Sequence, residues 1–190
     1  MSIPSLPVEE YRAKLKQTVA FPIFASIADD PGTTEDERRT WCNHFTRAVV
    51  RWFNFAKWKI PHVESGRRVD GERASDIVKW MQAHPEHWLD LRKPDGKIDF
   101  IGARNEALAG HCVIAGQFYV NTSTGTDPKK WVASGHVCPV APEAAMHPSG
   151  TFGCEVPMVA NVGGKVNEYG IPLSKAFKAP ITGLFLLRSA

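Results

Sequence analysis

Cys42 and His136 are the residues whose types and settings could together perform covalent chemistry. Cys42 stands in Trp41–Phe45 (WCNHF), and His136 follows Ser134-Gly135 far downstream. A thiol attacks an amide carbon as its thiolate, and an imidazole can take the thiol proton and later protonate the leaving amine. A cysteine on a helix and a histidine on a distant strand would therefore make a thiol hydrolase, provided that the fold brings them together.

The cysteine is expected on an amphipathic helix. Apolar residues recur there at the i, i+4, i+7, i+8 spacing of a buried face, namely at Trp41, Phe45, Ala48, Val49, Trp52, Phe53 and Ala56. Cys42 lies at the margin of this face, about 100° around the helix from Trp41, and His44 points away from Cys42. The helix dipole would favour the Cys42 thiolate if the helix starts near Thr40, and would do little if it starts at Thr34.

The remaining pattern predicts an α+β protein. One amphipathic helix is expected over residues 8–20, and a second carries Ala74, Ile77, Val78 and Met81 and ends before His84-Pro85, with Trp88 and Leu89 packing back on it. Residues 96–110 are expected to be irregular or briefly helical. Strands are expected over residues 111–120, 135–140, 156–162 and 181–187. Helices followed by strands predict N-terminal helices packed on one side of a central antiparallel sheet.

A third group should hold the imidazole in the right tautomer. Asn161 is the candidate, because it lies on the strand expected to follow that of His136 and hairpin neighbours would place the two side by side. Asparagine is also common at strand ends, and His111, which likewise follows a glycine, is an alternative base. Gly135 has no side chain and would let another backbone come close to the histidine strand.

Plainer readings of these residues remain open. Cys42 could be a small core residue, and His136 an edge-strand residue with a satisfied ring. Zinc could in principle bind Cys42, His136, Cys138 and Cys154, but the spacing matches no compact ligand pattern, and we expect no metal or cofactor. A disulfide is conceivable, with Cys138–Cys154 the first pairing to consider. Gly163-Gly164 is too short for a nucleotide-binding loop.

Length and composition predict a single domain over residues 1–190, with residues 1–34 as an N-terminal extension. The chain is 43% apolar and carries a net charge of +3. Its densest basic spots, Arg67-Arg68 and Lys129-Lys130, lack the aromatic partners of a nucleic-acid surface, so no nucleic-acid partner is expected. The sequence has neither an apolar run long enough to span a membrane nor a secretory signal at Met1–Glu10.

The order of these motifs resembles the NlpC/P60 cysteine peptidases and amidases, which cut peptidoglycan stem peptides. The resemblance rests on five short motifs, which are Cys42-Asn43-His44-Phe45, the helix Ala74–Val78 with Trp88 trailing it, the strand Gly110–Gly116, Gly135-His136-Val137, and Asn161 in Pro157–Asn161. It implies a papain-like fold with Cys42 as nucleophile, His136 as base and Asn161 as the residue that orients the base. Two departures are Trp41, where many relatives have Asp, and the extension before the cysteine.

Within this family the chain looks most like the amidase effectors of type VI secretion systems. That likeness implies synthesis in the cytoplasm without a signal peptide, delivery into the periplasm of a target bacterium, and an immunity protein that blocks the cleft. The implied substrate is the D-glutamyl–diaminopimelate bond or the diaminopimelate–D-alanine cross-link. The alternatives are a phage or housekeeping cell-wall lysin, a cysteine acyltransferase of the same fold, and a binding or structural module without the chemistry.

Overall fold

The computed structural model describes residues 3–21, 42–53, 74–118, 135–163, 166–177 and 179–188. Within these ranges the protein is α+β, with five helices and two antiparallel sheets. The helices are α1 (Val8–Val19), α3 (Cys42–Arg51), α4 (Ala74–Ala83), α5 (Phe100–Leu108) and α6 (Leu173–Ala176). The strands are β1 (Trp88–Asp90), β2 (Val113–Phe118), β3 (Gly135–Pro139), β4 (Met146–Ser149), β5 (Cys154–Asn161), β6 (Glu168–Pro172) and β7 (Gly183–Leu187).

The larger sheet has the strand order β1-β7-β2-β3, so β3 is an edge strand. Strand β7 (GLFLL) lies inside this sheet and is buried along its whole length. Its side chains alternate between two apolar clusters, as the two-residue period of a strand requires. Phe185 and Leu187 enter the cluster that contains α3 and α4, whereas Leu184 and Leu186 enter the cluster that contains α5. A strand that is covered on both faces reads as a continuous apolar run.

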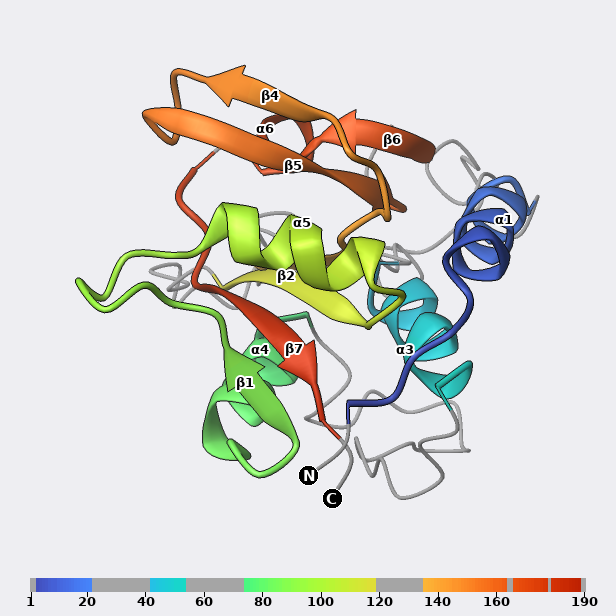
Figure 1. Ribbon diagram of the computed structural model, residues 1–190, viewed down its shortest axis with the longest axis horizontal. Helices are drawn as coiled ribbons and strands as arrows, with labels where there is room; N and C mark the ends of the chain where they lie inside the picture. Colours follow the sequence, from blue (N-terminus) through green and yellow to red (C-terminus); the bar gives the residue numbers. More distant parts are fainter. Residues whose placement is uncertain are drawn as a thin grey trace, which may run out of the picture.

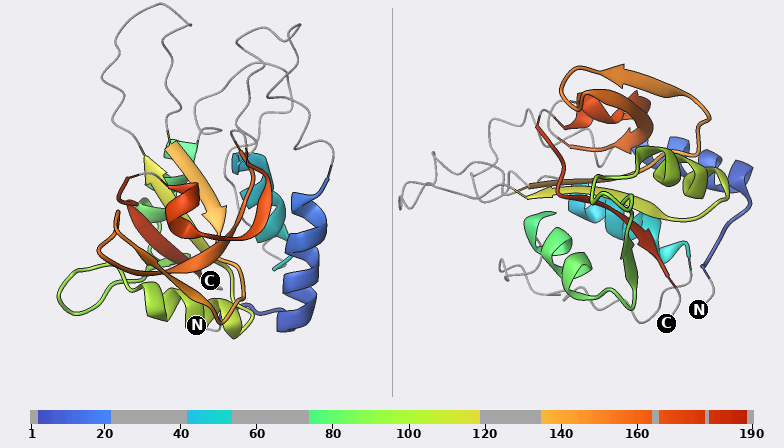
Figure 2. Two further views of the ribbon diagram at one scale, coloured as in Figure 1. Left: turned by 90° about the horizontal axis from the view of Figure 1, so that it is seen from above. Right: turned by 60° about the vertical axis from the view of Figure 1, so that its left-hand side comes forward.

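These two clusters define the layers of the molecule. The apolar faces of α3 and α4 pack on one face of the larger sheet, with Phe45, Val49, Ile77 and Val78 completely buried. Helix α5 and the smaller sheet cover the other face. Figure 1 shows the smaller sheet at the top, α5 and β2 in the middle and α4 below, and the right-hand view of Figure 2 shows the same layering.

The smaller sheet has the order β4-β5-β6. It is linked to the edge strand of the larger sheet by a single β-bridge between Val140 and Val159. The expected central antiparallel sheet is present as the larger sheet, but the strand expected over residues 156–162 belongs to the second sheet, because β4 lies between it and the histidine strand in the chain. β5 nevertheless contacts β3, so the two sheets meet at the edge where His136 lies.

Helix α1 belongs to the same core as the cysteine helix. Its Tyr11 and Leu15 are fully buried in the cluster that contains Cys42 and Phe45. Both views of Figure 2 show α1 beside α3. The division of residues 1–34 from the rest of the domain stays a prediction, but its helix contributes directly to the core.

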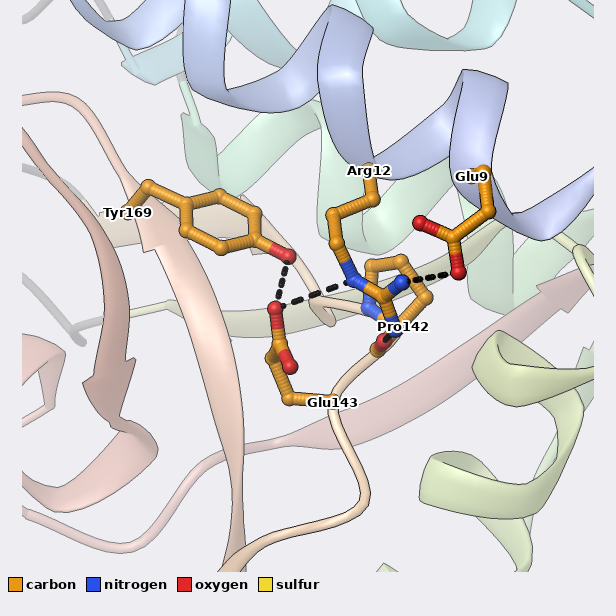
Figure 3. Close-up of polar contacts among 5 residues, drawn as sticks. All are labelled: Glu9, Arg12, Pro142, Glu143 and Tyr169. Atoms are coloured by element: carbon orange, nitrogen blue, oxygen red, sulfur yellow. Dashed lines mark hydrogen bonds and ion pairs between the residues drawn. The ribbon is translucent and has the colours of Figure 1, made fainter.

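A polar cluster fastens α1 to the second sheet (Figure 3). Arg12 donates to Glu143 Oε1 at 3.2 Å and to the carbonyl of Pro142 at 2.6 Å, and it also pairs with Glu9. Tyr169 of β6 donates its hydroxyl to the same Glu143 oxygen at 2.6 Å. Glu143 thus joins α1 to the strand that pairs with β5.

The strongest sequence patterns predicted the elements well. Helices α1 and α4 and strands β2, β3, β5 and β7 lie where they were expected, within a few residues. Residues 96–110 contain a regular helix, α5, because the Asp99 side chain caps it by accepting from the N–H of Gly102. The start of the cysteine helix, Trp41 and Ala56 lie outside the described residues.

Four short elements were not expected from the sequence, namely β1, β4, β6 and α6. Trp88 does pack with α4 as predicted, but Leu89 faces the other cluster, because the two adjacent residues belong to a strand. Among the described residues, no helix is both long and apolar enough to cross a bilayer.

Candidate active site

Cys42 is held in the core by the helix that carries it. It is the first described residue of α3, and its side chain is 0% exposed. The apolar face of α3 packs against β3, the strand of His136. The margin position predicted for Cys42 therefore directs the thiol toward the edge of the larger sheet.

His136 is the second residue of β3 and is partly exposed to solvent. Gly135 precedes it in very close contact with neighbouring backbone. A Cβ at this position would lie 2.4 Å from the carbonyl oxygen of Gln117 and 3.0 Å from the backbone nitrogen of Ser75. The expected close approach of another backbone at Gly135 is thus confirmed. It allows α4, β2 and β3 to meet directly beside the histidine.

Asn161, the last residue of β5, reaches His136 from the other sheet. Its Oδ1 lies 2.7 Å from Nε2 of His136, and its Nδ2 donates to the carbonyl of Val166 at 2.6 Å. The expected neighbourhood is therefore present, but its expected cause is wrong. The two residues do not share a hairpin, because β4 intervenes and β3 and β5 belong to different sheets.

The contacts of Asn161 define the tautomer of the imidazole. The carbonyl of Val166 can only accept, so the amide NH₂ must face it and Oδ1 must face the histidine. Since Oδ1 also only accepts, Nε2 of neutral His136 carries the proton. Nδ1 then has a free lone pair and can take a proton from a thiol.

Gly163 marks the place where the thiol and the imidazole meet. The position that a Cβ would occupy on Gly163 lies 3.5 Å from Cβ of Cys42, 3.4 Å from Cε1 of His136 and 3.8 Å from Nδ1 of His136. The side chains of Cys42 and His136 also form a hydrogen bond. The structure thus brings Cys42, His136 and Asn161 together, with Nδ1 on the side near Gly163 and Nε2 toward the amide.

The thiols change the protonation of the histidine. Burial alone would lower the pKa of His136, but hydrogen bonds and charge interactions with Cys138 and Cys42 raise that pKa well above its ordinary value of 6.5. An imidazolium in this position favours an ionised thiol beside it. The arrangement can therefore store the reactive thiolate as an ion pair.

Cys138 is a second thiol beside the same imidazole. It lies two residues after His136, and hence on the same face of β3, and is fully buried. Burial raises the pKa of Cys138 above its ordinary value, although the hydrogen bond and charge of His136 act in the opposite direction. Cys138 therefore stays a neutral thiol at pH 7.

The alternative sites are less suited to chemistry. His111 bonds to Glu106 through Nδ1 at 2.6 Å, an arrangement that fastens the end of α5 to the start of β2. All four cysteines are free thiols, and Cys154 is exposed whereas Cys138 is buried, so the structure contains no Cys138–Cys154 disulfide. Among the described residues, no group of three His, Cys, Asp or Glu side chains has the arrangement of a metal site.

Sequence reasoning missed Phe177 and undervalued Gly163. The Phe177 ring is fully buried and packs against the His136 ring, with 5.0 Å between centroids. No local pattern marks Phe177, because it follows a helix of only four residues. The sequence shows Gly163 only as part of a glycine pair too short for a nucleotide loop, whereas its positive φ of 141° permits the turn after β5.

Buried Asn161, the imidazole of His136 and the thiol of Cys42 form a chain of polar groups. This chain can move the thiol proton to the imidazole and so generate a thiolate nucleophile. Comparisons with protein-family models, with curated proteins and with solved structures found no match.

Proposed function

We propose that this protein is a cysteine amidase of the papain-like type that hydrolyses peptide amide bonds. The observation that carries the proposal is the Cys42–His136–Asn161 arrangement, in which the amide binds Nε2 while Cys42 bonds to the same imidazole. If Cys42 were only a core residue and His136 only an edge-strand residue, the fold would not need a thiol that ion-pairs with the imidazole. It would also not need a buried amide behind the ring. The resemblance to NlpC/P60 enzymes adds the papain-like fold and the choice of substrate.

Transfer of the Cys42 proton to Nδ1 of His136 forms the thiolate–imidazolium pair from which the reaction starts. The thiolate attacks the amide carbon and forms a tetrahedral oxyanion, while the Nε2–H of His136 stays bonded to Asn161. A backbone N–H close to Cys42 would stabilise this oxyanion, a contribution of roughly 10²–10³ in rate. The carbon–nitrogen bond then breaks as Nδ1 gives its proton to the leaving amine.

The second half of the reaction hydrolyses the thioester. Nδ1 takes a proton from water, the resulting hydroxide attacks the acyl carbon, and the Cys42 thiolate leaves. The carboxylic acid product loses its proton to solvent, and the thiolate–imidazolium pair is restored. No cofactor enters these steps, because His136 moves the protons of the thiol, the leaving amine and the attacking water.

The substrate that the resemblance favours is a peptidoglycan stem peptide or cross-link, with an immunity protein as inhibitor. The proposal includes delivery of the protein by a type VI secretion system into the periplasm of a target bacterium. The net charge of +3 suits an anionic polymer such as cell wall.

The decisive experiment is a digest of purified Gram-negative peptidoglycan, with products identified by liquid chromatography and mass spectrometry. Wild type should release shortened stems or remove cross-linked dimers, and Cys42→Ala should do neither. The matched control is Cys154→Ala, because Cys154 is also a free thiol but is exposed at the start of β5. It should match wild type.

Two results would contradict the proposal. Products that carry the acyl group on an amine or lipid would identify an acyltransferase. Unchanged peptidoglycan with folded wild type would indicate a binding or structural module.

A further inference from the structure

Gly163 is a partly exposed residue next to the reactive pair. Cys42 and Asn161 are buried, whereas His136 and Gly163 are both partly exposed. Among the described residues that surround the thiol and the imidazole, these two therefore form the accessible side.

The space beside Gly163 is about the size of a methyl group. A Cβ built on Gly163 would lie 3.4 Å from His136 and 3.5 Å from Cys42, which is ordinary van der Waals contact. A side chain would thus fit without forcing the two residues apart. It would, however, take up the gap next to the Cβ of Cys42 and the Cε1–Nδ1 edge of His136, beside which the acyl carbon of a substrate has to lie to react with the thiol.

We propose that Gly163 is a specificity-determining residue that keeps this gap open for the substrate. The inference rests on the proposed amidase function for the identity of the substrate. The substrate expected from this role is an amide whose acyl group lies close to the main chain at residue 163. That acyl group has no large substituent on the side that faces Gly163. Gly163 itself takes no proton and forms no bond to the substrate.

The turn around Gly163 supports this role, because it holds the α-carbon in place. The Gly163 N–H donates to Oδ1 of Asn167 at 3.0 Å, and its carbonyl accepts from the N–H of Val166 at 3.4 Å. The carbonyl of Val166 in turn accepts a hydrogen bond from Nδ2 of Asn161. Gly163 and Asn161, the residue that orients the base, are thus both hydrogen-bonded to Val166.

The first test is Gly163→Ala, measured as kcat/KM on a peptidoglycan stem peptide. One methyl group in the gap should lower kcat/KM by roughly 10- to 200-fold, the range found for one methylene in a shaped pocket. The control is Gly170→Ala. Gly170 also has a positive φ, 74°, but nothing lies within 4 Å of its would-be Cβ. It should carry the strain of a positive φ and keep full activity.

A second variant separates the methyl group from the strain. Positive φ is natural for a D residue, so replacing Gly163 by D-alanine relieves the strain and places the methyl group where the other α-hydrogen was. Ligation at Cys154 gives access to this full-length chain. The D-alanine protein should cleave the peptide much faster than Gly163→Ala. Equal losses in both proteins, or equal losses in Gly163→Ala and Gly170→Ala, would overturn the inference.

Alkylation of Cys42 provides a readout that does not need the amidase. In a Cys154→Ser background, Gly163→Ala should slow labelling by a fluorescein maleimide far more than labelling by iodoacetamide. If wild type cleaves no stem peptide, the proposed function fails, and this size dependence still decides the role of Gly163. Equal slowing of the two reagents would refute that role.

Discussion

Asn161 and His136 are bonded across two sheets, with 2.7 Å between Oδ1 and Nε2. The amide is buried, and its other end is committed to the carbonyl of Val166. The orientation of the imidazole therefore depends on how the smaller sheet packs against the edge of the larger one.

Replacing Asn161 by Ala should lower kcat and stability together. It leaves the His136 N–H and the Val166 carbonyl without their partner, at a cost of about 1–3 kcal/mol in the free energy of unfolding. The loss of kcat should be smaller than that caused by removing His136. The control Asn105→Ala changes an exposed asparagine on α5 and should affect neither quantity. Chemical denaturation and steady-state kinetics measure both, and a fully active Asn161→Ala would show that the amide does not orient the base.

Substitutions of His136 and His111, the two histidines that follow a glycine, should have clearly different effects on kcat. His136→Gln removes the base and should lower kcat by roughly 10²–10⁴-fold. His111→Gln removes a partly exposed partner of Glu106, which costs about 0–1 kcal/mol of stability. It should leave kcat unchanged. A larger loss of kcat in His111→Gln than in His136→Gln would transfer the role of base to His111.

The elevated pKa of His136 predicts a pH-dependent stability. A histidine whose pKa is raised by folding stabilises the protein fully below its unfolded value of 6.5, and that stabilisation is lost as the pH rises through the folded value. Measured in a Cys42→Ala background, where no thiolate takes up a compensating proton on unfolding, the difference in unfolding free energy between the protein with His136 and His136→Gln should therefore shift against the former as the pH rises above 6.5. Urea titrations between about pH 6 and pH 9.5 measure it. A pH-independent difference would mean that folding does not change this pKa.

Tyr169→Phe should loosen the attachment of α1. The lost hydrogen bond joins a hydroxyl to a carboxylate, which makes it worth about 1.5 kcal/mol, the lower end for bonds to charged groups because Glu143 is partly exposed. Unfolding free energy should fall by that amount while the Cys42 alkylation rate stays the same. Loss of alkylation with unchanged stability would instead connect this cluster to the active site.

The pKa of Tyr169 offers a direct check of the same cluster. Burial and the hydrogen bond to Glu143 raise the pKa of Tyr169 well above its ordinary value of 10.0. Ultraviolet titration of wild type and Glu143→Gln should show a tyrosine that ionises more readily in the variant. An unchanged titration would argue against the hydrogen bond.

The sequence predicted those parts of the fold in which one periodic pattern runs for several residues. The apolar faces of α1 and α4 and the continuous run of β7 are of this kind. Strands β4 and β6 gave no such signal, because β4 includes Pro148 and β6 includes Gly170 and Pro172, residues that usually interrupt strands. Both strands form because they pair with β5, and no local sequence pattern predicts this pairing.

The candidate site shows the same limit. Cys42 and His136 could be selected by residue type and by the elements that carry them. Asn161 was selected through a hairpin that does not exist, and only the meeting of two sheets explains its position. The contacts of Phe177 and Gly163 depend on tertiary packing alone, so their places beside His136 became visible only in three dimensions.

The position of β7 has a consequence for the order in which this protein matures. Residues Gly183–Leu187 insert between β1 and β2, although they are made after the thiol, the imidazole and the amide. Until they emerge from the ribosome, Trp88–Asp90 and one edge of Val113–Gly116 have no strand to pair with. Contacts between segments so distant in the chain form late in folding. A growing chain would thus carry Cys42, His136 and Asn161 before the larger sheet is complete, and the arrangement of these three groups would form only after residues 183–187 have been added.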